Sequence, residues 1–166
     1  MTSSVASLFK TLTQGVYLIG VGYGAERNAF TAAWVMQVSF DPLLLALSIN
    51  PGHSSYRLLQ ESGAFSVSVL KRDQLDLAAR YGDPKREGGL ADKEWRAAKL
   101  GVPVLRGGLA WFACEVQHEC PAGDHTLVVG KVVDGALLDA SSTPLAYRDT
   151  GDMDGAAALY PARLGP

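Results

Sequence analysis

Short apolar runs separated by turn residues restrict most strongly what this chain can fold into. They are rich in valine, leucine, isoleucine and phenylalanine, and they lie at residues 16–22, 29–38, 43–49, 65–69, 112–119 and 126–133. Most of the connections between them are short, which favours antiparallel pairing. Closing such a sheet into a barrel would remove its exposed edges. We therefore expect a mainly β protein built on a closed antiparallel barrel.

The pattern within individual runs predicts how each strand is buried. Residues 43–49 are almost continuously apolar, which indicates a central strand that is covered on both faces. In residues 65–69 apolar side chains alternate with serines, as expected for a half-buried strand. In residues 112–119 phenylalanine, cysteine, valine and histidine share one face, and acidic and amide side chains share the other. Residues 121–124 then supply a hairpin turn.

Short helices are expected between the strands. A serine at position 3 or 4 can cap a helix that reaches residue 12. Ser54 or Ser55 can cap a two-turn helix that Gly63 ends in a left-handed conformation. A third helix is predicted over residues 73–81, followed by a charged connection to residue 100.

Composition and charge exclude several classes of protein. The 166 residues suit a single domain over residues 1–166. Fifteen basic and seventeen acidic side chains leave a net charge of −2, so the basic footprint of a nucleic-acid-binding protein is missing. The longest apolar runs are far shorter than the roughly 20 residues of a membrane-spanning helix. Two cysteines cannot form a disulfide framework, and a cytoplasmic location is expected.

A glycine motif near the N-terminus suggests a dinucleotide fold. Gly20, Gly22 and Gly24 follow a predicted strand, and Asp41 lies about twenty residues further on. The helix that this fold requires would span residues 26–36, which contain Phe, Thr, Trp and Val and are poor helix formers. A glycine-rich hairpin is the favoured interpretation.

A cluster of sulfur and imidazole groups raises the question of a metal site. Cys114, His118 and Cys120 fall on one face of the predicted strand, and His53 or His125 could join them. Their spacing matches none of the usual zinc patterns. Cys114, between Phe112 and Val116, is most simply a small core residue. No metal site is therefore expected.

Small and polar residues in the first third of the chain point to a flat ligand. Small side chains at Ala32 and Ala33 would allow a ring to approach the backbone, whose N–H and C=O groups could bond its edge. A helix that starts near Ser54 and Ser55 would offer hydroxyls and free N–H groups to a phosphate. The alternative interpretation is a tightly packed strand and an ordinary serine cap.

Together with other short motifs, these residues resemble the flavin reductase-like, FMN-binding split-barrel family. The resemblance covers most of the chain. Its motifs are Asn28, Thr31-Ala-Ala-Trp34, Ser39, Pro42, His53-Ser-Ser55, Ser62-Gly-Ala-Phe65, Gly101-Val-Pro103, Ala113-Cys-Glu115, Gly123-Asp-His125, Gly130-Lys-Val132 and Pro144-Leu-Ala-Tyr147. One departure is Leu43, which stands where the family usually has a second proline, and several ring-lining positions are alanine.

The resemblance implies a fold and an activity. The fold would be a six-stranded antiparallel split β-barrel with a few short helices, assembled as a homodimer. Each subunit would bind FMN or FAD and would reduce flavin with NADH or NADPH, in some cases to supply a separate monooxygenase. Because the hydride passes between nicotinamide and flavin, no essential general acid or base is expected.

The resemblance also assigns roles to individual residues. His125 would lie near the flavin ring and the nicotinamide and is the one candidate for a catalytic role. The cofactor-binding candidates fall into three groups: Thr31, Ala32, Ala33 and Trp34 along the ring; Ser48 and Asn50 near it; and His53, Ser54, Ser55 and Arg57 at the phosphate. Arg57 could equally be an ordinary residue on the helix surface.

Two other function classes stay open at this point. One is a flavin-binding electron carrier or redox protein without NAD(P)H activity of its own. The other is a β-barrel interaction module that binds no cofactor. The two differ in colour, because only the first would purify as a yellow protein.

Overall fold

The computed structural model describes residues 4–164. Its strands are β1 (Tyr17–Tyr23), β2 (Glu26–Ala32), β3 (Val35–Phe40), β4 (Leu43–Ile49), β5 (Ala64–Val69), β6 (Trp95–Ala97), β7 (Pro103–Leu105), β8 (Ala110–Ala122) and β9 (His125–Leu137). The α-helices are α1 (Val5–Phe9), α2 (Ser54–Ser62) and α3 (Leu75–Gly82), and the 3-10 helices are η1 (Lys99–Gly101), η2 (Tyr147–Thr150) and η3 (Ala156–Leu159). The expectation of a mainly β chain with a few short helices is confirmed.

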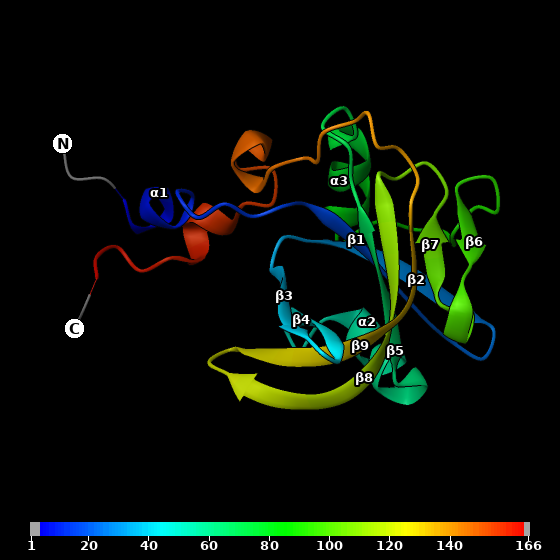
Figure 1. The fold of residues 1–166 in the computed structure, drawn as a ribbon. Coiled ribbons are helices and arrows are strands. Elements are labelled where there is room, and N and C mark those ends of the chain that lie inside the picture. Colours follow the sequence, from blue (N-terminus) through cyan, green and yellow to red (C-terminus); the bar gives the residue numbers. More distant parts are fainter. Residues whose placement is uncertain (1–3, 165–166) are drawn as a thin grey trace.

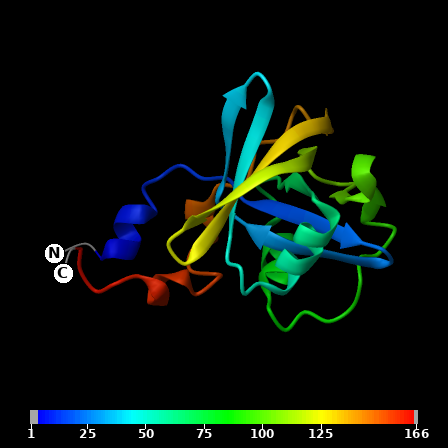
Figure 2. The same ribbon diagram turned by 90° about the horizontal axis from the view of Figure 1, so that it is seen from below.

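Seven strands form one curved antiparallel sheet, in the order β2-β1-β5-β8-β9-β4-β3 (Figure 1). Strands β2 and β3 therefore lie at its two ends, although they follow each other directly in the chain. The short strands β6 and β7 form a separate hairpin. Helix α2 packs against β1 and β2 (Figure 2), and α3 packs against β2.

Strand β1 is buried along most of its length. Its residues Ile19 and Val21 contribute to a core cluster with Phe65 of β5 and Leu59 of α2. Leu18 points the other way, into a second cluster beneath α3. The strand is thus covered on both faces, as its unbroken apolar run allows.

The prediction of one strand over residues 29–38 is wrong, because two strands share this segment. Strand β2 pairs with β1 up to Ala32, and β3 pairs with β4 from Val35 onward. The two residues between them carry the chain from one end of the sheet to the other. The backbone N–H of Ser48 donates to the carbonyl of Trp34 at this crossing.

Burial also differs from the prediction in two strands. Strand β4 lies between β3 and β9, but its first residue, Leu43, is exposed, so only its second half is covered. Strand β5 is buried on both faces because β7 covers its serine side. There the Ser66 hydroxyl donates to the carbonyl of Pro103, and the Ser68 hydroxyl accepts from the N–H of Leu105. Serine alternation here marks hydrogen bonding to β7 rather than exposure to solvent.

The predicted helices are present with shifted ends. Helix α1 is capped by Ser4 and is shorter than expected; Ser3 lies outside the described residues. Helix α2 ends at Gly63 in a left-handed conformation, as expected, but its N-cap is His53 rather than a serine. Helix α3 begins after Gln74. The charged connection that follows contains β6 and η1.

The glycine motif forms a hairpin, as the sequence favoured. Strands β1 and β2 are antiparallel neighbours, with Tyr23 opposite Glu26. A side chain at Gly20 would overlap the Pro103 carbonyl oxygen and approach the Ser66 hydroxyl. The glycine thus permits β7 to pack closely on β1.

A bulge changes the predicted faces of β8. The register with β9 shifts between Val116 and His118, so the side chain of His118 is exposed instead of sharing the face of Cys114. Cys114 is fully buried, and burial raises the pKa of its thiol to about 12. Within residues 4–164 no group of three or more His, Cys, Asp or Glu side chains is placed to hold a metal ion.

The two ends of the described chain lie side by side, away from the sheet (Figures 1 and 2). Phe9 of α1 and Tyr160 after η3 have ring centroids 5.3 Å apart, and the Lys10 ammonium donates to the carbonyl of Gly151. None of the helices in residues 4–164 is long and apolar enough to cross a membrane.

Candidate functional site

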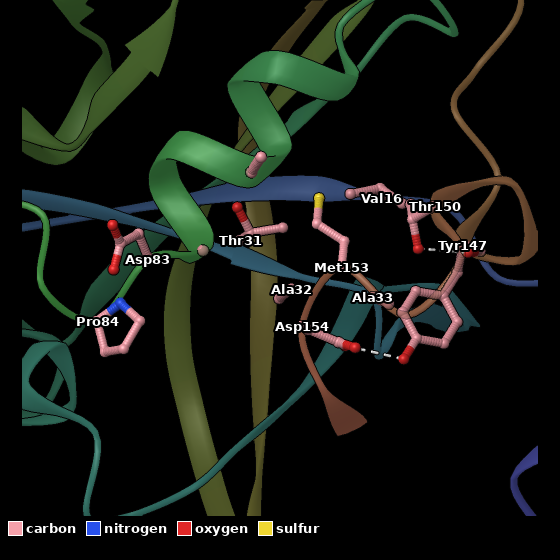
Figure 3. A pocket seen from close by; sticks show the side chains of 12 residues that line it. Val16, Thr31, Ala32, Ala33, Asp83, Pro84, Tyr147, Thr150, Met153 and Asp154 are labelled. Atoms are coloured by element: carbon pink, nitrogen blue, oxygen red, sulfur yellow. Dashed lines mark hydrogen bonds between the residues drawn. The ribbon is translucent and has the colours of Figure 1, made fainter. Parts of the chain in front are cut away.

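Three cavities lie along β2 and along residues 33 and 34, where the chain crosses from β2 to β3. The first has a volume of about 320 Å³ and lies between β2, the end of α3 and the C-terminal segment, residues 147–154 (Figure 3). Thr31, Ala32 and Ala33 form its wall on the β2 side. On the opposite side lie Tyr147, Thr150, Met153 and Asp154.

The second cavity extends the first toward the start of β2. It has a volume of about 410 Å³ and is lined by Asn28 to Thr31, by His53 and Ser54, and by the loop that follows α3. Thr31, Asp83 and Asp154 line both cavities, so the two adjoin. Together they form one groove along β2.

The third cavity lies on the other side of Ala33. It has a volume of about 330 Å³ and contains Trp34 and Ser48 together with residues from the segment that precedes β1. Ala33 lines both this cavity and the first. The crossing between β2 and β3 therefore separates two hollows.

The groove meets β2 along its edge. Successive side chains of a strand point to opposite faces, yet the consecutive residues from Asn28 to Ala33 all line the two cavities. Strand β2 is also an end strand, paired only with β1 in the seven-stranded sheet. Alternate backbone N–H and C=O groups along its outer edge can therefore bond a ligand. Small side chains at Ala32 and Ala33 leave room for a flat group.

A hydrogen-bonded network closes the other end of the groove at the start of α2. The His53 ring lies 4.4 Å from the Phe30 ring, and its Nδ1 atom accepts from the backbone N–H of Ser55 at 3.1 Å. Burial lowers the pKa of His53, which keeps the ring neutral and able to accept this bond at neutral pH. The Asn28 amide donates to the Ser55 hydroxyl at 2.8 Å.

The two serines of the predicted phosphate loop are placed differently. Ser54 lines the groove, whereas Ser55 is fully buried, with its hydroxyl bonded to Asn28. Asn50 lies just before the helix, where its side-chain oxygen accepts from the N–H of Gly52. Asn50 thus shapes the turn into α2, and it does not line any of the three cavities.

His125 lies against the crossing rather than in the groove. Its ring is 4.9 Å from that of Trp34, inclined by 57°. Its Nδ1 atom forms a 2.8 Å hydrogen bond with the Asp124 carboxylate, which lowers the pKa of that carboxyl. Trp34 and Ser48 share the third cavity. The structure therefore brings His125, Trp34 and Ser48 together on the far side of Ala33 from Ser54.

Arg57 lies on the exposed surface of α2. Its guanidinium bonds the carboxylates of Glu26 and Glu61 at 2.5 and 2.6 Å. It lines none of the three cavities. This is the alternative that the sequence left open for Arg57.

Several groove residues were not among the sequence candidates. Arg86 comes from the loop after α3, and Tyr147 and Asp154 come from the C-terminal segment, where the tyrosine hydroxyl donates to the carboxylate at 2.8 Å. Burial, and then the adjacent carboxylate, raise the pKa of Tyr147. Arg86 is one of fourteen charged residues in positions 71–99, and no local pattern distinguishes it from the others.

Comparison with known proteins identifies the family. The model of the flavin reductase-like domain matches residues 9–156. This chain belongs to the flavin reductase-like domain family. It is 30% identical over 139 residues to the NADH-dependent FMN reductase AsuE2 of Streptomyces nodosus subsp. asukaensis, a match that covers 82% of this chain and 75% of the relative.

Other members of the flavin reductase-like family agree in sequence and in fold. The reductase component of 4-hydroxyphenylacetate 3-monooxygenase of Thermus thermophilus is 31% identical over 137 residues, which cover 82% of this chain and 85% of the relative. Among solved structures, BorF, the flavin reductase component of a bacterial two-component tryptophan halogenase, superposes with a TM-score of 0.75 at 29% identity. That match covers 85% of this chain and 96% of BorF.

Proposed function

We propose that this protein is an FMN-binding NAD(P)H:flavin oxidoreductase, which transfers a hydride from a nicotinamide to a flavin. The groove along the edge of β2 carries the proposal. Its wall of small residues, Ala32 and Ala33, leads toward Ser54 at the start of α2. The named activities of relatives such as AsuE2 support the same reaction.

The residues of the groove fit FMN in size and chemistry. The two adjoining cavities, of about 320 and 410 Å³, fall in the usual range for small-molecule sites, about 300–1,000 Å³. The edge of β2 supplies backbone donors and acceptors for the polar rim of a flat ring. Ser54 supplies a hydroxyl at a helix N-terminus, an arrangement that suits a phosphate.

Each part of the chain then has a task. When bound, FMN supplies the ring nitrogen that accepts or gives the hydride. Thr31 to Ala33 hold the ring against β2, Ser54 binds the phosphate, and buried Ser55 positions Asn28. Trp34, in contact with the His125 ring, continues this wall past Ala33. A nicotinamide that lies on the exposed face of the flavin ring would meet this aromatic pair, with Ser48 nearby.

We also propose the finer features that the resemblance implies. Residues 1–166 form one domain whose sheet is a split β-barrel, with six strands in the barrel wall and β3 as an outlying strand. The protein works in the cytoplasm and supplies reduced flavin to a separate monooxygenase or related oxygen-using enzyme. The Thermus thermophilus and halogenase relatives, named as reductase components, support such a partner.

The same proposal includes a homodimer, supported by an apolar surface on β3. This end strand and its neighbours expose large apolar side chains: Trp34 (43%), Met36 (64%), Val38 (42%), Phe40 (86%) and Leu43 (51%). A soluble chain rarely leaves such a row uncovered. A second copy related by two-fold symmetry would cover it and also protect the free edge of β3.

The activity can be tested with the purified protein and added FMN. Under anaerobic conditions, NADH or NADPH should remove the yellow absorption of FMN, and the rate should be proportional to the enzyme concentration. A yellow complex that neither nucleotide bleaches would instead identify an electron carrier. A protein that binds no flavin would overturn both readings.

Replacing His125 should affect the nicotinamide more than the flavin. We expect His125→Ala to raise the KM for the nicotinamide about tenfold through loss of the stacked ring, with little change in the Kd for FMN. His118→Ala, on the exposed face of the same hairpin, is the matched control. Unchanged reductase kinetics in His125→Ala would remove the proposed role.

The neighbouring serines should respond differently to replacement. Ser54→Ala should weaken FMN binding about tenfold and leave riboflavin binding unchanged, because only FMN carries the phosphate. Ser55→Ala leaves the Asn28 amide without its buried partner, so it should lower the melting temperature as well. Both sets of values follow from fluorescence titration and thermal unfolding. Equal losses for FMN and riboflavin in Ser54→Ala would contradict the phosphate assignment.

The dimer can be tested on the exposed apolar row. Size-exclusion chromatography with light scattering should give the mass of two chains for the wild type and of one chain for Phe40→Glu. Leu159→Glu, at an equally exposed apolar residue of η3, should remain dimeric. A monomeric wild type, or a dimeric Phe40→Glu, would show that β3 is not the interface.

A further inference from the structure

Arg86 is turned inward from a loop that is otherwise open to solvent. Residues 82–89 are exposed except for Arg86, which is half-buried. The turn at Asp83 directs it, since the Asp83 side chain accepts from the N–H of Lys85 at 2.8 Å and its carbonyl accepts from the N–H of Arg86 at 3.1 Å. The inward direction is therefore built into the loop.

The Arg86 guanidinium is held in one orientation inside the groove. Its Nη2 atom donates to the Asn28 side-chain oxygen at 2.6 Å, and its Nη1 atom donates to the Gly88 carbonyl at 3.1 Å. Its central carbon lies 4.7 Å from the centre of the Tyr81 ring, a cation–π contact. Asn28 in turn bonds Ser55, so Arg86 is linked to the start of α2.

The charge of Arg86 has no anionic partner among the described residues. In residues 4–164 no carboxylate oxygen lies within 4.0 Å of its nitrogens, whereas Arg80, over the same Tyr81 ring, pairs with Glu94 at 2.7 Å. A partly desolvated cation without a counter-charge favours an anionic ligand.

The two carboxylates that share the cavity already have other partners. Asp83 accepts from the N–H of Lys85, and Asp154 accepts from the Tyr147 hydroxyl and from the N–H of Ala156. The end of the groove next to Asn28 thus combines a guanidinium with the Ser54 side chain. This pairing of a cation with a helix N-terminus matches a phosphate ester.

We propose that Arg86, which lines the same cavity as Ser54, binds the phosphate of FMN, so that the protein selects a phosphorylated flavin over riboflavin. This inference rests on the proposed function. It orients the ligand in the groove, with the phosphate between Ser54 and Arg86 and the ring beside Ala32 and Ala33. Planar, fixed donors make Arg86 better suited to this contact than a lysine would be.

The test compares Arg86→Gln with Arg80→Gln. Arg80 touches the same tyrosine but is ion-paired and does not line the groove, so it controls for loss of the cation–π contact. We expect Arg86→Gln to weaken FMN binding about 10–100-fold and to leave riboflavin binding unchanged. Arg80→Gln should change neither. Arg86→Lys should recover part of the affinity for FMN.

Salt dependence provides a second measurement. The Kd for FMN should rise with ionic strength in the wild type and should rise less steeply in Arg86→Gln. If Arg86→Gln loses affinity for FMN and riboflavin equally, or keeps the wild-type Kd for FMN, then Arg86 does not bind the phosphate. Neither result would contradict the proposed reductase activity, because the wild type would still bind flavin. A wild type that binds neither flavin would overturn the proposed function itself.

Discussion

The free outer edge of β2 is the constraint on which the candidate site depends. The chain leaves β2 at Ala33 and Trp34 and crosses to β3 at the far end of the sheet, so β2 pairs with β1 alone. A strand edge of this kind offers main-chain donors and acceptors but needs protection from other chains. Here α3 and the C-terminal segment enclose the edge and convert it into a groove. A flat, polar-rimmed cofactor suits such an edge without charged side chains.

The polar end of the groove depends on a chain of contacts between distant segments. His53 caps α2, Ser55 bonds Asn28 of β2, and Asn28 bonds Arg86 of the loop after α3. Each member holds the next in place, so the geometry around Ser54 is set before a ligand arrives. This preorganised geometry, together with the family to which the chain belongs, supports a flavin reductase site.

Much of the fold could be predicted from local patterns, and the errors have physical causes. The β1–β2 and β8–β9 hairpins and the end of α2 at Gly63 follow from periodicity and glycine placement. Serine alternation in β5 was misleading because β7, 37 residues away in the chain, provides hydrogen-bond partners for Ser66 and Ser68. A bulge in β8 places the His118 side chain on the opposite face from the predicted one, and the neighbouring residues show no pattern that predicts a bulge.

By itself the sequence determined the mainly β architecture, the family, and the small-residue and serine motifs of the site, because these depend on residues close together in the chain. Only the tertiary structure decided that Ser54 lines the groove while Ser55 is buried. It also decided that Arg57 forms ion pairs with Glu26 and Glu61 on the surface. Arg86 is the arginine that lines the groove. Arg86 and Ser54 are some thirty residues apart, and a charge in a polar loop carries no local mark of its partner. Packing therefore determines which cationic side chain lines the groove, because burial and ion pairing depend on the folded chain as a whole.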